Sequence, residues 1–198
     1  FVSALLPLAL CFLYKGVTTA SWRNYVGFGV TVGLSLITPH VQLTYYLLMA
    51  AGFWWLYLVF LGGERPAGSS WVGSAALFAG ALVLGFSLAA IQLLPFFEYI
   101  QYSPRGAEGS SSTGYEYGTG WSMPPEEVLG TLWPAFMGNL RDYWGRNPFK
   151  LHSDYIGVAT LVLASFGFLL ERRRRLAWFF VFLTAYGLLF AFGGYTPF

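Results

Sequence analysis

Six polar residues lie at the ends of long apolar runs, where side chains from several segments could meet and do chemistry. They are His40, Gln42, Gln92, Glu98, Asp154 and Tyr155. Polar groups at membrane depth carry a high free-energy cost and tend to face a cavity or a polar partner. The pattern therefore predicts a site at one face of a membrane. For Gln42 and Gln92 the simpler alternative is a hydrogen bond to a neighbouring helix.

His40 follows Pro39 in a short turn that we predict at the membrane surface. An imidazole changes charge near neutral pH, so it could carry a proton or bind a phosphate. It could equally cap the helix that follows. The sequence leaves both interpretations open.

Arg105 and Arg141 add cations in the long segment after the fourth apolar run. A transfer from a lipid phosphate needs a base for the acceptor hydroxyl and a cation for the leaving phosphate. The segment supplies both types, with Glu98 a candidate to orient the acceptor. The alternatives are that the arginines are solvated loop charges and that Asp154 caps a helix. A divalent metal is possible among the carboxylates, but no ligand spacing supports one, so no metal ligand is predicted.

The composition is that of a membrane protein. Hydrophobic residues make up 56% of the 198 residues and charged residues 10%, against about 25% charged in soluble domains. Because lipid offers no partner to backbone groups, each apolar run should be a helix, and about 20 residues cross the bilayer. We predict an all-α polytopic bundle of about six spans. The runs are residues 1–14, 25–38, 43–61, 71–94, 155–170 and 176–192.

The basic residues indicate the orientation. Lys15, Arg23, Arg65 and the run 172–175 mark every second break between the apolar runs, and positive loops stay cytoplasmic. We predict one transmembrane domain over 1–198, with 96–154 as a single extracytoplasmic loop. Seven of the eleven basic residues serve this orientation, so membrane lipid is an expected partner and nucleic acid is not.

Three local patterns refine this prediction. After Ser122 and two prolines, Glu126 and Glu127 suit the start of a short interfacial helix, with Ser122 as its cap and an apolar face of Val128, Leu129, Leu132 and Trp133. Pro95 should end the fourth span, since proline cannot donate a helical hydrogen bond. Gly29 and Gly33 have the spacing of a close helix contact.

The order of several short motifs resembles the YfhO-type bacterial membrane proteins. These motifs are QLLP (92–95), SPR (103–105), WSMPPEE (121–127), PAFMG (134–138), YWG (143–145), DYIG (154–157) and GGYTP (193–197). PHVQL (39–43) resembles the family's His-Pro-Gln turn, with Val41 where the family often has proline. The likeness covers nearly the whole chain.

The resemblance implies a function. The family is placed with the GT-C-like membrane glycosyltransferases, thought to move a sugar from a polyprenyl phosphate carrier to a cell-envelope glycopolymer or glycolipid acceptor. It implies a multi-pass protein of the bacterial cytoplasmic (inner) membrane. The catalytic acidic residue of such enzymes usually lies after the first span, so we expect this chain to be an internal fragment that lacks it. The alternatives are a transporter or flippase for a lipid-linked substrate and a non-catalytic scaffold.

Overall fold

The computed structural model describes residues 2–38, 41–66, 68–103, 118–138, 142–146, 154–171 and 174–196. Every regular element among these residues is a helix, as the sequence predicted. The chain divides into two compact units, Phe1–Ser103 and Pro104–Phe198, and each is described by itself.

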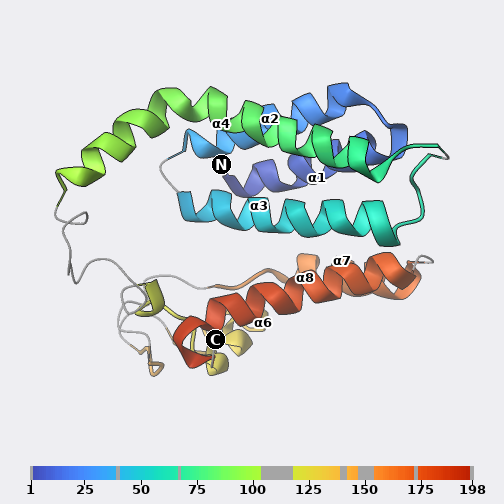
Figure 1. Cartoon of the computed structure of the whole chain (residues 1–198). Coiled ribbons are helices and arrows are strands. Elements are labelled where there is room, and N and C mark those ends of the chain that lie inside the picture. The colour runs from blue at the N-terminus through green and yellow to red at the C-terminus, as the bar shows by residue number, and fades with distance from the viewer. Residues whose placement is uncertain are drawn as a thin grey trace. The chain divides into compact units, whose positions relative to one another are not determined.

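The first unit is a bundle of four helices (Figure 1). They are α1 (Val2–Thr19), α2 (Trp22–Leu36), α3 (Val41–Leu56) and α4 (Trp71–Gln101). Helix α2 packs against α4 and α1, and α1 also packs against α3. Fully buried apolar side chains such as Leu13, Phe28 and Val32 form the core between them.

Glycines bring α2 and α4 into close contact, which confirms the contact predicted from Gly29 and Gly33. A Cβ on Gly29 would lie 2.6 Å from the carbonyl oxygen of Ala81, and one on Gly85 would lie 2.8 Å from the carbonyl oxygen of Gly29. A Cβ on Gly33 would meet Leu88 at 3.1 Å. The two backbones therefore pack without intervening side chains, as small residues allow in membrane helices.

Helix α3 does not end as a regular α-helix. It continues as a π-helix, η1 (Tyr57–Leu61), in which the Gly62 amide donates to the Tyr57 carbonyl oxygen at 2.7 Å. Near this end, Trp55 Nε1 donates to Ser74 Oγ at 3.1 Å, and Ser74 Oγ lies 2.7 Å from Tyr25 Oη. One serine of α4 thus ties α2 and α3 to α4.

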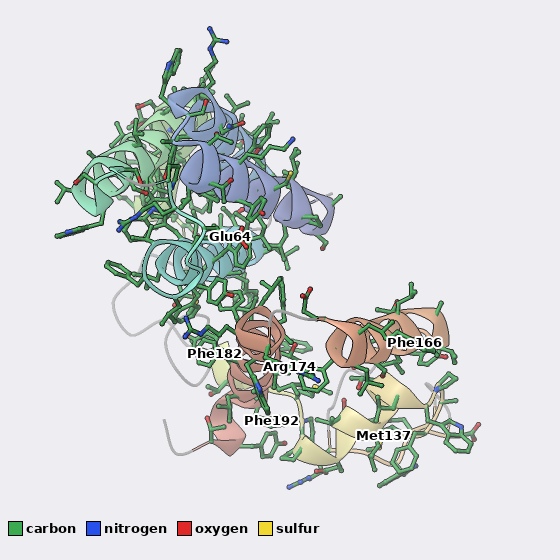
Figure 2. The ribbon with its side chains drawn as sticks, turned by 90° about the vertical axis from the view of Figure 1, so that its right-hand side faces the viewer. Glu64, Met137, Phe166, Arg174, Phe182 and Phe192 are labelled. Atoms are coloured by element: carbon green, nitrogen blue, oxygen red, sulfur yellow. The ribbon has the colours of Figure 1, made fainter. Side chains whose placement is uncertain are left out.

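The second unit holds a short helical segment and two longer helices. The short elements are η2 (Pro125–Glu127) and α6 (Val128–Leu132). The longer ones are α7 (Val158–Leu170) and α8 (Arg174–Phe192), and α8 runs into a 3₁₀ turn, η3 (Gly193–Tyr195). Large apolar side chains such as Phe166 on α7 and Phe182 on α8 are exposed, and they extend outward from their ribbons (Figure 2).

Four helical stretches of the described residues are long and apolar enough to cross a membrane. They are Val2–Thr19, Val41–Leu61, Trp71–Gln101 and Arg174–Tyr195. The other two predicted spans correspond to α2 and α7, which have 15 and 13 residues and fall short of the roughly 20 that a bilayer requires. The chain therefore has the helices of a membrane protein, with four rather than six of full spanning length.

The prediction that Pro95 ends the fourth span is wrong. Helix α4 continues through Pro95 to Gln101 and curves in its last turns (Figure 1). Proline removes one hydrogen bond, yet membrane helices tolerate this loss when the rest of the turn is satisfied. The predicted loop 96–154 consequently begins with helical residues, and the segment after α1 shrinks to Ala20 and Ser21 because α1 extends to Thr19.

Candidate functional site

Three predicted site residues of the first unit, Gln42, Gln92 and Glu98, are exposed. Gln42 is in the first turn of α3, and its Nε2 donates to Tyr46 Oη at 2.8 Å, a bond within one helix rather than to a neighbouring one. Gln92 and Glu98 both belong to α4, but six residues of an α-helix turn its face by about 240°. The two side chains therefore leave α4 in different directions.

The remaining predicted residues lie in the second unit or outside the described residues. His40, Arg105 and Arg141 fall outside them. Asp154 is exposed and does not cap α7 as predicted, because the capping position is Gly157. Instead Tyr155 Oη accepts a hydrogen bond from the Val158 amide at 2.9 Å. The predicted convergence of all eight residues stays a prediction.

A cluster that the sequence did not predict lies in the second unit, and we call it the carboxylate cluster: Glu126, Glu127, Tyr143, Arg146 and Tyr195. Glu127 is only 1% exposed, and the Tyr143 hydroxyl donates to its Oε1. A buried carboxylate needs such partners, since an unpaired charge in the interior is very costly. The sequence predicted the same role for both glutamates, as charges at a helix start. In the structure the two side chains have different partners and different burial.

Glu126 forms the second half of the cluster, a paired contact with Arg146. Arg146 donates from Nε and Nη2 to the two carboxylate oxygens at 2.6 and 2.7 Å, the two-pronged geometry that favours arginine. The guanidinium carbon also lies 5.0 Å from the centre of the Tyr195 ring. The hydrogen bonds from Arg146 lower the pKa of Glu126, and Glu126 in turn raises the pKa of Arg146.

Backbone bonds fix this segment to the end of α8. The Met123 amide donates to the Ala191 carbonyl oxygen at 2.7 Å, and the Gly194 amide donates to Ser122 Oγ at 2.8 Å. Ser122 therefore does not cap the following helix as predicted, since the capping position is Pro124. Gly193 has a φ of +40°, and a Cβ there would collide with Ser122 Oγ, so this close approach requires glycine.

The short helix of the segment presents an apolar surface. Leu129, Leu132 and Trp133 are all exposed, as an interfacial helix requires. Helix α6 itself has five residues. Near its C-terminal end, the Ile156 amide donates to the Thr131 carbonyl oxygen at 3.1 Å, and beyond the helix the Trp144 amide donates to that of Met137 at 3.2 Å.

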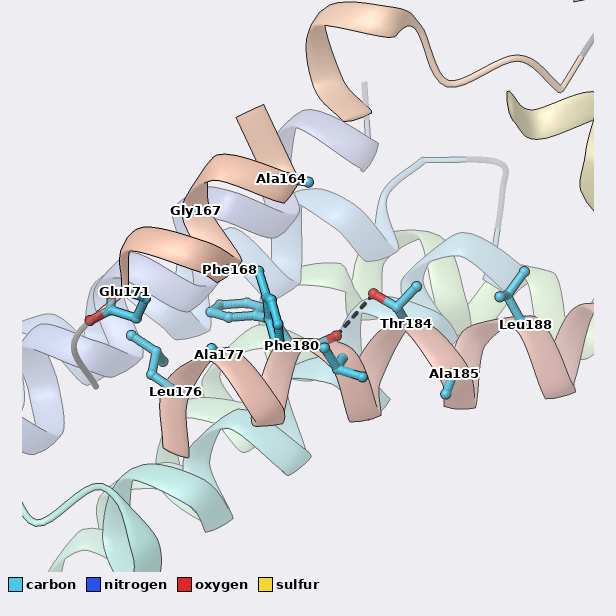
Figure 3. A pocket seen from close by; sticks show the side chains of 11 residues that line it. Ala164, Gly167, Phe168, Glu171, Leu176, Ala177, Phe180, Thr184, Ala185 and Leu188 are labelled. Atoms are coloured by element: carbon cyan, nitrogen blue, oxygen red, sulfur yellow. Dashed lines mark hydrogen bonds between the residues drawn. The ribbon is translucent and has the colours of Figure 1, made fainter. Parts of the chain in front are cut away.

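An apolar groove of about 670 Å³ runs between α7 and α8 (Figure 3). We call it the α7–α8 groove. Its lining residues are Ala164, Gly167, Phe168 and Glu171 on the α7 side and Leu176, Ala177, Phe180, Val181, Thr184, Ala185 and Leu188 on α8. Thr184 Oγ1 donates to the Phe180 carbonyl oxygen at 2.9 Å, so its hydroxyl is satisfied within α8. Among the described residues of the lining, Glu171 alone is charged, and the groove suits an apolar chain.

The carboxylate cluster joins three of the motifs on which the family resemblance rests: WSMPPEE, YWG and GGYTP. Glu127 and Tyr143 are 16 residues apart, and Ser122 and Gly194 are 72 apart. The sequence shows these motifs only by their order along the chain. Their spacing does not indicate which motifs contact one another in the fold.

No group of three or more His, Cys, Asp or Glu side chains that could hold a metal occurs among the described residues. Comparisons with family models, with curated proteins and with solved structures find no match to this chain. The function is therefore argued from the residues and their geometry.

Proposed function

We propose that this chain is part of a GT-C-like integral membrane glycosyltransferase. It would move a sugar from a polyprenyl phosphate carrier to a cell-envelope glycopolymer or glycolipid, on the outer face of a bacterial cytoplasmic membrane. The finer topology of about six spans belongs to the same proposal. The observation that carries it is an apolar groove on α8 that points toward a segment rich in polar groups.

The register of α8 connects the two features. The groove residues Ala177, Val181, Thr184 and Leu188 recur every three or four residues, so they form one stripe along the helix. The next position on that stripe is Ala191, whose carbonyl oxygen accepts the Met123 amide. A polyprenyl chain in the groove with its phosphate toward the C-terminal end of α8 would place that phosphate near the carboxylate cluster.

The reaction would be an inverting displacement at the sugar carbon. The acceptor oxygen forms a bond to that carbon, and the bond from the carbon to the phosphate oxygen breaks. The phosphate leaves with the electron pair, and the acceptor proton passes to a carboxylate base. His40, Arg105 and Arg141 would steady the phosphate, and Glu98 would orient the acceptor.

The carboxylate cluster has a positioning role in this scheme. Glu127 with Tyr143, and Glu126 with Arg146, join residues 142–146 to the start of the short helix, while Met123 and Arg146 contact Ala191 and Tyr195 at the end of α8. Held groups exclude water and limit hydrolysis of an activated sugar. The cluster thereby defines the polar end of the groove.

Polar residues buried in the first unit disfavour the flippase alternative. Thr31, Ser35 and Thr44 are buried, and their hydroxyls donate to the carbonyl oxygens of Gly27, Val32 and Ser35. They are satisfied by backbone and do not line a polar path, which a transporter needs near the middle of the membrane.

Sugar transfer in vesicles tests the proposal. The full-length protein is reconstituted with a radiolabelled polyprenyl phosphate sugar and an envelope acceptor extract. Ala185→Trp fills the groove and should lower transfer by about tenfold or more, because a buried chain loses its contacts. Ala159→Trp makes the same change on α7 outside the groove lining and should leave transfer near the wild-type rate.

Four results would contradict parts of this assignment. Full transfer by Ala185→Trp would exclude the groove as the donor site. Unchanged transfer after both His40→Ala and Arg105→Ala would exclude those side chains from the mechanism. Movement of the labelled donor across the bilayer without transfer would favour a flippase. Retention of both sugar transfer and donor movement in a deletion strain would favour a scaffold.

A further inference from the structure

A second cavity lies in the first unit, at the end of the bundle opposite the α3 N-terminus. Its volume is about 210 Å³, which is room for several waters at about 30 Å³ each. It is enclosed by the last turns of α1, the first turns of α2 and α4, and the loop before α4. The lining residues used below are Tyr25, Arg65, Ser70, Gly73 and Ser74.

Arg65 gives the cavity its charge. Its Nη1 atom is buried and has no hydrogen-bond partner among the described residues. A guanidinium stays protonated and has five N–H donors and no acceptor. A buried donor on a charged group without an acceptor is rare and destabilising, so the position calls for an acceptor that the protein does not supply.

The first turn of α4 adds backbone donors. Ser70 precedes the helix and its Oγ accepts the Val72 amide at 3.1 Å, which leaves other first-turn amides without a partner in the helix. Helix α4 has 31 residues, so its N-terminal end carries the full partial positive charge of a long helix. Gly73 on the same turn lines the cavity, and the nearest atom to a Cβ built there is 4.0 Å away.

A count of hydroxyl hydrogens adds one more donor. Tyr25 Oη and Ser74 Oγ share a single hydrogen bond, and Ser74 Oγ also accepts the Trp55 indole N–H. Two hydroxyls bring two hydrogens, and their mutual bond uses one. Whichever of them donates, the other hydrogen remains at a residue that lines the cavity.

The cavity therefore collects an arginine, helix amides and a hydroxyl, and none of the described residues that line it is a carboxylate. We propose that it binds a phosphate-class anion, supplied either by an anionic lipid headgroup or as free phosphate. The location favours this chemistry, because the ends of membrane-length helices lie at the depth of lipid phosphates. The donors match the oxygens of a phosphate, which arginine and helix N-termini recognise together.

Binding measurements on the full-length protein in neutral detergent test the proposal. The two probes are inorganic phosphate and phosphatidylglycerol in mixed micelles, with phosphatidylcholine micelles as the blank. Arg65→Gln should weaken binding by about tenfold or more, because hydrogen bonds to charged groups are among the stronger ones. Arg23→Gln is the matched control, since Arg23 carries the same charge at the start of α2 and is not among the residues that line the cavity.

A second variant tests the cavity rather than the charge. Gly73→Leu keeps every charge, favours the helix and fills the space, so it should also weaken binding by about tenfold. Saturable binding of phosphatidylglycerol alone identifies a headgroup site, and saturable binding of inorganic phosphate identifies a free-anion site; both support the proposal. Equal losses in Arg23→Gln and Arg65→Gln, full binding by Gly73→Leu, or no saturable binding of either probe would overturn it.

Discussion

Two adjacent glutamates illustrate how neighbours, rather than residue type, decide what a side chain does. Glu126 is partly exposed and meets Arg146 through two hydrogen bonds, whereas Glu127 is buried and meets a tyrosine hydroxyl. In the sequence both are simply acidic residues at a helix start. Their different partners come from residues 143–146, which the chain brings back onto the short helix.

The ion pair of Glu126 predicts a response to acid. The pKa of Glu126 is lowered in the folded protein. The stabilisation that its ion pair with Arg146 contributes to the fold is therefore fully present above the ordinary glutamate pKa of about 4.3. It is lost as the pH falls through the lower, folded value. We expect the hydrogen-exchange protection factors of residues 142–146 to stay constant from about pH 8 to pH 5 and to fall below about pH 4.

Glu126→Gln and Arg146→Gln are the matched variants for this measurement. Each should show lower protection at neutral pH and a weaker acid dependence than the wild type. An acid dependence in Glu126→Gln equal to that of the wild type would show that another group is responsible.

At the scale of helices, the close contact between α2 and α4 depends on residues with little or no side chain. Gly29, Ala81 and Gly85 let two backbones approach so closely that a single methyl group would meet a carbonyl oxygen. Helix α2 is short for a bilayer, but it packs against both α1 and α4. Its place in the bundle thus depends on packing more than on its own length.

Alanine substitutions at two glycines test this contact. Gly29→Ala should destabilise the bundle by about 1–3 kcal/mol, the usual cost of overpacking. Gly80→Ala adds the same methyl on α4 where no atom lies within 4 Å, and it should stabilise by up to about 1 kcal/mol through helix propensity. Reversible unfolding in detergent measures both. Stabilisation by Gly29→Ala would show that α2 and α4 do not pack this way.

For the whole molecule, the decisive property is which side of the membrane each segment faces. In the proposed topology of about six spans, α2, α3 and α4 each cross the membrane, and the alternating basic breaks then predict opposite sides for the α1–α2 connection and for the segment 118–146. The proposed transfer reaction requires the latter to face away from the cytoplasm.

Thiol labelling of intact cells measures this orientation. In a Cys11→Ser background, which removes the single native cysteine, Gly118→Cys should react with a membrane-impermeant maleimide. Thr19→Cys should react only after permeabilisation. Both positions are exposed. Reaction of Gly118→Cys only from the inside would exclude the proposed outer site.

Periodic and compositional features could be predicted from the sequence. The apolar runs predicted the helices, and the spacing of Gly29 and Gly33 predicted the close contact between α2 and α4. The prediction that Pro95 ends the fourth span was wrong. The rule that proline ends a helix does not hold where a longer apolar helix surrounds the proline.

The candidate sites depend on contacts that no local pattern specifies. Tyr143 and Glu127, or Ser122 and Gly194, meet only once the chain has folded back. The same holds for Arg65, which has a buried nitrogen and lines one cavity together with Tyr25, Ser70 and Gly73. Sequence spacing alone cannot supply these juxtapositions.

The π-helix at the end of α3 bears on how this chain tolerates changes in length. A π turn holds one residue more than an α turn, and such turns are often found near functional sites. The residues of η1 therefore accommodate an extra residue locally, before the loop that carries Arg65. Homologues that have lost one residue within 57–61 could restore a regular α-helix and keep that loop in place, whereas a deletion elsewhere in α3 would rotate Trp55 away from Ser74.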